Sequence, residues 1–206
     1  ISFIQKLCDG FEGKDILMPW AEAGVLAKSV EESKPKHLRC LDAEQVHGSF
    51  LKHVLDNSEV VVDDPYQNIL EDSSQYDLIL GCPSFNHGPR EVYEHDNICI
   101  KPSYSDCLIA ACLEKLKDNG LAVFIVPPSF VIRKGDSHSF WKNANVLGAS
   151  IKAVFDLPQG YWGTMTSIRS HLIVVGKGEQ QKIFSAAYSN DEVPNIQVFE
   201  NFSKSK

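Results

Sequence analysis

The chain has 206 residues, of which 43% are hydrophobic, and its formal net charge is −7. This length and composition fit one domain around a packed core. No apolar run approaches the roughly 20 residues that cross a membrane. Stand-alone nucleic-acid-binding domains usually carry a basic face. The acidic charge therefore indicates that any nucleic acid is held mainly by parts outside this chain, or that nucleic acid is not its substrate.

The six cysteines form no C-x-x-C pair and have no histidine at zinc-ligand spacing. We therefore expect no metal site, and free thiols buried in a reducing, cytoplasmic compartment. The chain begins at Ile1 without a methionine or a signal-peptide pattern. These features favour a single domain over residues 1–206 that has been excised from a longer chain.

Predicted strands alternate with predicted helices along the chain. Strands are expected over 14–19, 37–41, 59–63, 76–81, 121–126, 150–156 and 170–176, with a last one near 181–186. Helices are expected over 22–32, 43–55, 104–117 and near 137–147, with a long polar loop over about 85–103. This alternation predicts an α/β fold with a mostly parallel sheet covered on both faces. Ligands of such sheets bind beyond the carboxyl ends of the strands.

Two of the predicted helices carry more specific expectations. The helix over 43–55 would place Val46, Phe50, Val54 and Leu55 on one helical face. The helix over 104–117 would be stopped by the turn dipeptide at 119–120 (NG).

The strongest motif follows the strand over 76–81. Residues 77–85 (DLILGCPSF) resemble the D-L-I-[IV]-G-N-P-P-[FY] signature of amino-group methyltransferases. In that family the Asn side chain and the first Pro carbonyl accept hydrogen bonds from the target amino group, and the aromatic residue stacks on an extruded base. The resemblance assigns these catalytic positions to Cys82, Pro83, Ser84 and Phe85. Cys82 replaces the Asn, and a thiol is a weak acceptor. Ser84 replaces the second Pro.

The turn after the first strand resembles the cofactor-binding motif of the same family, x-I-L-D-P-A-C-G-T-G-G-L. The resemblance implies contact with S-adenosylmethionine at Pro19, Trp20, Ala21 and Gly24. Met18 stands at the strand-end Asp, and Glu22 stands at the first turn glycine. Glycines let the backbone approach the methionine end of the cofactor, so Glu22 would bring bulk and negative charge to that place.

Acidic residues end the second and third strands. The resemblance assigns Asp42 to the ribose hydroxyls of the cofactor, and capping of the following helix is an equal alternative. Either Asp63 or Asp64 would face the adenine amino group of the cofactor, with turn formation before Pro65 as the alternative.

The C-terminal half resembles modification subunits of type I restriction systems. The similar segments are 113–127, 153–158, 163–167 and 172–175, and the whole resemblance covers about residues 3–178. It implies the DNA adenine-N6 methyltransferase family and a Rossmann-like class I S-adenosylmethionine-dependent fold with a seven-stranded sheet.

Two functional hypotheses follow from the resemblance. In the first, the domain binds S-adenosylmethionine and methylates adenine in DNA, which it holds with help from other domains or subunits. In the second, it is a catalytically inactive scaffold or DNA-docking module of a larger assembly, because Met18, Glu22 and Cys82 each replace a residue that the chemistry requires. Methylation of RNA or of a protein glutamine is a third possibility.

Overall fold

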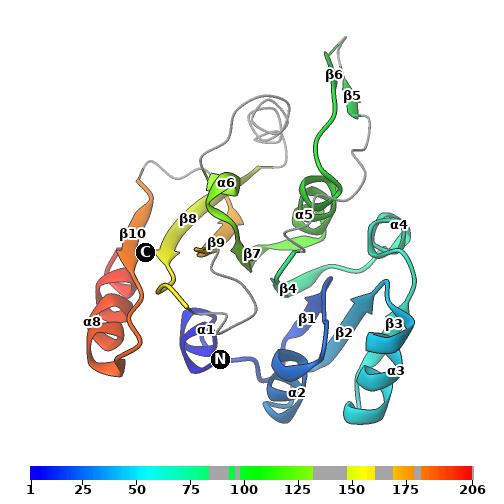
Figure 1. The fold of residues 1–206 in the computed structure, drawn as a ribbon, viewed down its shortest axis with the longest axis horizontal. Coiled ribbons are helices and arrows are strands. Elements are labelled where there is room, and N and C mark those ends of the chain that lie inside the picture. Colours follow the sequence, from blue (N-terminus) through cyan, green and yellow to red (C-terminus); the bar gives the residue numbers. More distant parts are fainter. Residues whose placement is uncertain (84–92, 96–97, 132–147, 161–168, 179–181, 206) are drawn as a thin grey trace.

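The computed structural model describes residues 1–83, 93–95, 98–131, 148–160, 169–178 and 182–205. An eight-stranded sheet forms the centre, in the order β10-β8-β9-β7-β4-β1-β2-β3 (Figure 1). Its strands are β1 (Asp15–Met18), β2 (His37–Asp42), β3 (Glu59–Val62), β4 (Tyr76–Gly81), β7 (Leu116–Val126), β8 (Ala149–Asp156), β9 (His171–Lys177) and β10 (Phe184–Ala187). The helices are α1 (Ser2–Leu7), α2 (Val25–Glu32), α3 (Gln45–Val54), α4 (Pro65–Glu71), α5 (Tyr104–Glu114), α6 (Pro128–Val131) and α8 (Glu192–Ser203).

The sheet is mostly parallel, as predicted. Strand β9 pairs antiparallel with β7 and with β8, and every other neighbouring pair is parallel. The expected number of seven strands is wrong, because β10 adds an eighth strand beside β8. This strand lies close to the last segment predicted from the sequence.

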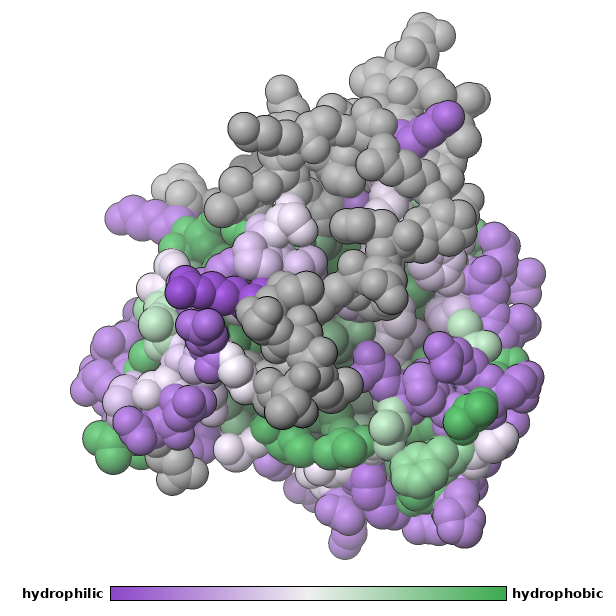
Figure 2. Space-filling model, viewed as in Figure 1, coloured by the Kyte–Doolittle hydropathy of each residue, from purple (hydrophilic) through white to green (hydrophobic). Residues whose placement is uncertain are grey.

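Helices cover both faces of the sheet, which explains why its strands read as continuous apolar runs. Successive residues of a strand point to opposite faces. In β1, Ile16 and Met18 join a core with α1, α2, α3 and α8, whereas Leu17 joins a core with α4, α5 and α6. All three side chains are at most 1% exposed. In the space-filling view, hydrophilic side chains predominate on both flanks, where small hydrophobic patches are also exposed, and a further hydrophobic patch lies in the lower middle (Figure 2).

The predicted face of α3 is correct at its C-terminal end, where Leu55 is buried and Val54 packs against the core, and wrong at Val46 and Phe50. Val46 and Phe50 are 77% and 50% exposed, and the residues of α3 that are buried are Gly48 and Leu51. A Cβ atom on Gly48 would lie 2.0 Å from Cγ2 of Val62, so α3 approaches β3 as closely as a glycine permits. A count of apolar side chains misses such a face, because a glycine contributes no side chain to it.

The predicted boundary between α5 and the following strand is also wrong. Helix α5 ends at Glu114, and β7 begins at Leu116. The pairing of β7 with β4 shifts register between Tyr76 and Leu78, and this irregularity takes up residues 117–120, including the expected turn. Lys117 lies in this bulge and donates hydrogen bonds to carboxylates at the amino ends of β1 and β4.

Several elements were not predicted from the sequence. Helices α1, α4, α6 and α8 are additional, and the expected polar loop contains an antiparallel hairpin of β5 (Tyr93–His95) and β6 (Ile98–Ile100). Figure 1 shows this hairpin standing out from the sheet above α5. The helix expected near 137–147 lies outside the described residues.

Candidate functional site

A pocket of about 260 Å³ opens at the carboxyl ends of β1 and β4. Three segments meet there: the turn between β1 and α2, the end of β4, and the inner face of β7. Helix α1 contributes a fourth wall. The described lining residues are Ile1, Ile4, Met18, Trp20, Ala21, Glu22, Ala23, Gly24, Val25, Leu26, Leu80, Gly81, Cys82, Val123 and Ile125. Parallel α/β sheets bind ligands beyond the carboxyl ends of their strands, so the pocket is the candidate site.

Two residues with positive φ in the turn between β1 and α2 prevent the helix from starting earlier in the chain. Glu22 has φ 46° and Gly24 has φ 75°, so α2 begins at Val25 and not at residue 22 as predicted. A Cβ atom on Gly24 would lie 2.8 Å from Cδ2 of Leu51. Gly24 is therefore needed for the left-handed turn and for packing of α2 on α3, whatever the pocket binds.

Asp42 ties the turn after β1 to the turn after β2. Its Oδ2 accepts a hydrogen bond from the backbone N–H of Glu22 at 2.9 Å, and its Oδ1 accepts one from the N–H of Glu44 at 2.8 Å. Nδ1 of His47 lies 3.2 Å from the same Oδ1. Glu44 is the N-cap residue of α3 and makes no side-chain cap of its own. The carboxylate of Asp42 thus organises the start of α3 without occupying the cap position.

Asp64 caps α4. Its Oδ1 accepts hydrogen bonds from the N–H of Tyr66 at 2.8 Å, from the N–H of Gln67 at 3.4 Å, and from the hydroxyl of Tyr104 at 2.6 Å. Pro65 occupies the first turn of α4, where its missing N–H costs nothing. Asp64 therefore connects the end of β3 to α5, and the signature of Asp before Pro could have predicted this helix.

Cys82 lies at the end of β4, half-buried in the pocket wall. Burial raises the pKa of its thiol to about 12, and the negative charge of Glu22 adds to the rise. The thiol is therefore neutral at physiological pH, and it is neither a nucleophile nor a strong acceptor. Ser84 and Phe85 lie outside the described residues.

Glu22 is the only charged side chain among the described lining residues of the pocket. Loss of hydration raises the pKa of its carboxyl group; the electrostatic interaction with His47 opposes this rise, and the interaction with Asp42 adds to it. Its side chain accepts no hydrogen bond from any described residue. The pocket is accordingly an apolar hollow lined by one carboxylate, and the residue that carries it is exposed to solvent.

The structure brings together part of the predicted site. Trp20, Ala21, Gly24 and Cys82 share the pocket, whereas Pro19, Pro83, Asp42 and Asp64 lie outside its lining. The sequence did not point to the contributions of Ile4 from α1 or of Val123 and Ile125 from β7. These residues carry no polar signal, and only the packing of α1 and β7 brings them to the site.

The strand order, with one antiparallel strand inserted beside β7, defines the fold of class I S-adenosylmethionine-dependent methyltransferases. A protein of Listeria monocytogenes assigned to that class superposes with a TM-score of 0.73 and 14% identity, covering 98% of this chain and 68% of that one. A chain of Vibrio vulnificus YJ016, assigned as the modification subunit of a type I restriction enzyme, gives 0.75 and 15%, covering 99% and 51%. A chain of a type I restriction-modification system gives 0.70 and 20%, covering 92% and 44%.

This chain therefore spans about half the length of the two type I restriction-modification chains. No protein-family profile matches the sequence, and no curated protein matches it. Within the described part of the chain, no helix is long and apolar enough to cross a membrane, and no three metal-ligating side chains come together.

Proposed function

We propose that this domain binds S-adenosylmethionine in the pocket and belongs to the methyltransferases of the DNA adenine-N6 class. One observation carries the proposal: the β1–α2 turn and the end of β4 form two walls of the same pocket, at Trp20–Gly24 and Gly81–Cys82. Methyl transfer requires a donor and an acceptor held side by side in one orientation. In the proposed arrangement, the motif at the β1–α2 turn holds the methyl donor, and the motif at the end of β4 holds the acceptor.

The residues present fit the cofactor. Oδ1 of Asp42 already has two partners, the N–H of Glu44 and Nδ1 of His47. Oδ2 accepts one backbone N–H and can accept a second bond, which suits a ribose hydroxyl. The apolar walls suit the thioether carbons, and Glu22 offers a negative charge to a cationic cofactor. The carboxylate of Asp64 is already committed to α4 and Tyr104, so we assign it to positioning the end of β3 near the adenine.

The cofactor supplies an electrophilic methyl group, and the chain orients the nitrogen that receives it. In the proposed arrangement, the backbone carbonyl of Pro83 accepts a hydrogen bond from the target amino group, and Phe85 stacks on the base. Cys82 contributes a weak acceptor where an amide would hold the amino group firmly. We therefore expect slow transfer compared with a domain that has Asn at this position.

DNA is the proposed substrate, held with help from other domains or subunits. The net charge of −7 leaves little attraction for phosphates in this chain. The two type I chains that resemble it are about twice as long, which supports a shared binding surface.

Calorimetric titration of the purified chain with S-adenosylmethionine tests cofactor binding. We expect saturable binding with a micromolar dissociation constant, weakened about tenfold by Asp42→Asn because a charge-assisted hydrogen bond is lost. Asp118→Asn is the matched control and should bind like the wild type, since Asp118 is exposed near the start of β7, at the opposite ends of the strands from the pocket. No binding at millimolar cofactor contradicts the proposal.

A second candidate is a module that binds the cofactor without transferring the methyl group. The neutral, half-buried thiol of Cys82 favours it. Transfer of labelled methyl groups to adenine-containing DNA separates the two candidates, with Cys82→Asn and Cys82→Ser as paired variants. Transfer by the wild type eliminates the second candidate. Transfer by Cys82→Asn alone supports it and identifies Cys82 as the altered position.

A further inference from the structure

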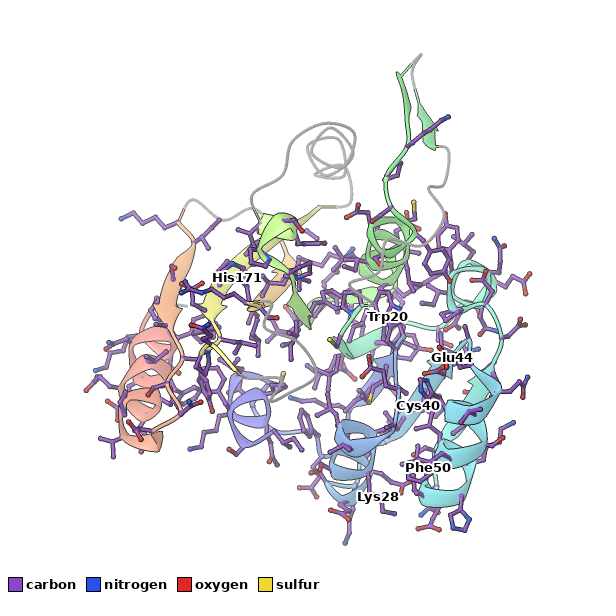
Figure 3. The ribbon with its side chains drawn as sticks, viewed as in Figure 1. Trp20, Lys28, Cys40, Glu44, Phe50 and His171 are labelled. Atoms are coloured by element: carbon purple, nitrogen blue, oxygen red, sulfur yellow. The ribbon has the colours of Figure 1, made fainter. Side chains whose placement is uncertain are left out.

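Two side chains give the apolar pocket a specific chemistry. Trp20 packs over the end of β4: a Cβ atom on Gly81 would lie 3.0 Å from Cε3 of its ring. Figure 3 shows Trp20 at the carboxyl ends of β1 and β4. Glu22 lies two residues further along the same turn and lines the same pocket. An aromatic face and a carboxylate in an apolar hollow form the combination that recognises onium cations.

The backbone of Glu22 is unusual for its residue type. A φ of 46° is the left-handed region that favours glycine, and the N–H of Glu22 is held there by Oδ2 of Asp42 at 2.9 Å. A strained residue of this kind persists when the surroundings hold it, and such residues gather at functional sites. The strained turn carries the only charged side chain of the described pocket lining.

The negative charge of Glu22 acts on Cys82, on the other side of the pocket. It contributes to the raised pKa of the Cys82 thiol, which lies at the opposite motif. A positive group seated between the β1–α2 turn and Cys82 therefore interacts favourably with this carboxylate. Glu22 is exposed to solvent at the pocket, so salt screens this interaction.

We propose that Trp20 and Glu22 recognise the positively charged sulfonium of S-adenosylmethionine and thereby discriminate against S-adenosylhomocysteine, its neutral thioether product. This inference rests on the proposed function. The two molecules differ by one methyl group and one positive charge at sulfur. Burial of a methyl group alone accounts for about fourfold discrimination. The aromatic face and the carboxylate raise this to about 30-fold and favour exchange of product for fresh cofactor.

Calorimetry with three ligands at neutral pH tests the inference: S-adenosylmethionine, S-adenosylhomocysteine and sinefungin, in which an ammonium-bearing carbon replaces the sulfonium. We expect the wild type to prefer both cations over S-adenosylhomocysteine by about 30-fold. Trp20→Leu and Glu22→Gln should each reduce the preference toward about fourfold, mainly by weakening the cations. High salt should weaken the cations in the wild type more than in Glu22→Gln.

Matched controls are available on α3, away from the pocket lining. Phe50→Leu changes an exposed aromatic residue, and Glu44→Gln changes an exposed acid; both are labelled in Figure 3. Both should keep the wild-type preference. If Glu22→Gln folds poorly by circular dichroism, Glu22→Gly removes the charge in a residue that accepts the observed φ.

The outcomes separate this inference from the proposed function. Equal affinity of the wild type for all three ligands, or an undiminished preference in both variants, overturns the role of Trp20 and Glu22 while leaving cofactor binding intact. Absence of binding by any of the three ligands overturns the proposed function and this inference with it.

Discussion

Replacement of Gly48 by alanine should destabilise the protein, although helix propensity alone predicts the opposite. In the interior of an exposed helix, glycine to alanine stabilises by about 0.8–1 kcal/mol. In α3, however, the added Cβ would lie 2.0 Å from Cγ2 and 3.0 Å from Cγ1 of Val62 on β3. Overpacking of this kind costs about 1–3 kcal/mol. A contact of 2.0 Å is far below van der Waals distance, so the cost should lie in the upper part of this range, about 2–3 kcal/mol. It outweighs the gain in propensity, and we expect a net loss of about 1–2 kcal/mol.

Thermal and urea unfolding followed by circular dichroism measures this loss. For a chain of this size, it corresponds to a Tm lower by about 3–6 °C. Ser49→Ala on the exposed side of α3 is the control and should stabilise by about 0.5 kcal/mol. The double variant Gly48→Ala/Val62→Ala removes the clashing methyl groups, so the two changes should couple by about 1–2 kcal/mol. A Gly48→Ala protein as stable as the Ser49→Ala control would refute the close packing of α3 on β3.

Three further changes test other parts of the structure. Leu51→Ala should cost about 2–4 kcal/mol in urea unfolding because Leu51 is fully buried, whereas Phe50→Ala should cost less than about 1 kcal/mol; the reverse order would restore the face predicted from the sequence. Glu22→Gly should raise the unfolding free energy by about 0.5–1 kcal/mol, because it relieves a positive φ, and an unchanged or lower value contradicts the strain. Glu31→Gln should lose about 2–3 kcal/mol of unfolding free energy at neutral pH. Because the variant has no carboxylate to protonate at this position, its stability should fall less than that of the wild type when the pH is lowered from neutral to acid.

The prediction for Glu31 follows from its hydrogen bonds. Its carboxylate accepts bonds from the N–H of Asn57 at 2.8 Å and the hydroxyl of Ser58 at 2.7 Å, with Lys28 at 3.0 Å. Despite a desolvation cost, these partners lower its pKa from 4.5 to about 2. The carboxylate therefore binds fewer protons in the folded state than in the unfolded state. Its contribution to stability is present above pH 4.5 and is lost as the pH falls toward 2.

Much of the fold could be predicted from local pattern. The run over 76–81 is apolar because both of its faces are buried, and the alternation of such runs with helical segments predicted the parallel sheet. The ends of strands are where a parallel sheet presents its ligands. Trp20, Gly24 and Cys82 could therefore be selected as site residues before their contacts were known, and they do share one pocket.

The polar residues were harder to interpret, because their partners are far away in the chain. The hydroxyl of Tyr104 reaches Asp64 across 40 residues, and the N–H of Glu22 reaches Asp42 across 20 residues. No local sequence pattern predicts these two hydrogen bonds. The sequence alone suggested that Glu22 would only intrude on the cofactor, whereas its place opposite Cys82 in the pocket makes it a candidate for recognising charge.

The sequence by itself determined the class of fold and the ends of the strands where the pocket opens, since both follow from hydrophobic periodicity and from turn residues that act locally. Only the tertiary structure decided which face of α3 is buried, that the bulge over 117–120 belongs to β7, and that α1 closes the pocket. These features depend on how closely two elements approach each other. A close approach is set by the absence of a side chain at Gly48 and by packing between distant segments, neither of which leaves a periodic signal in the chain.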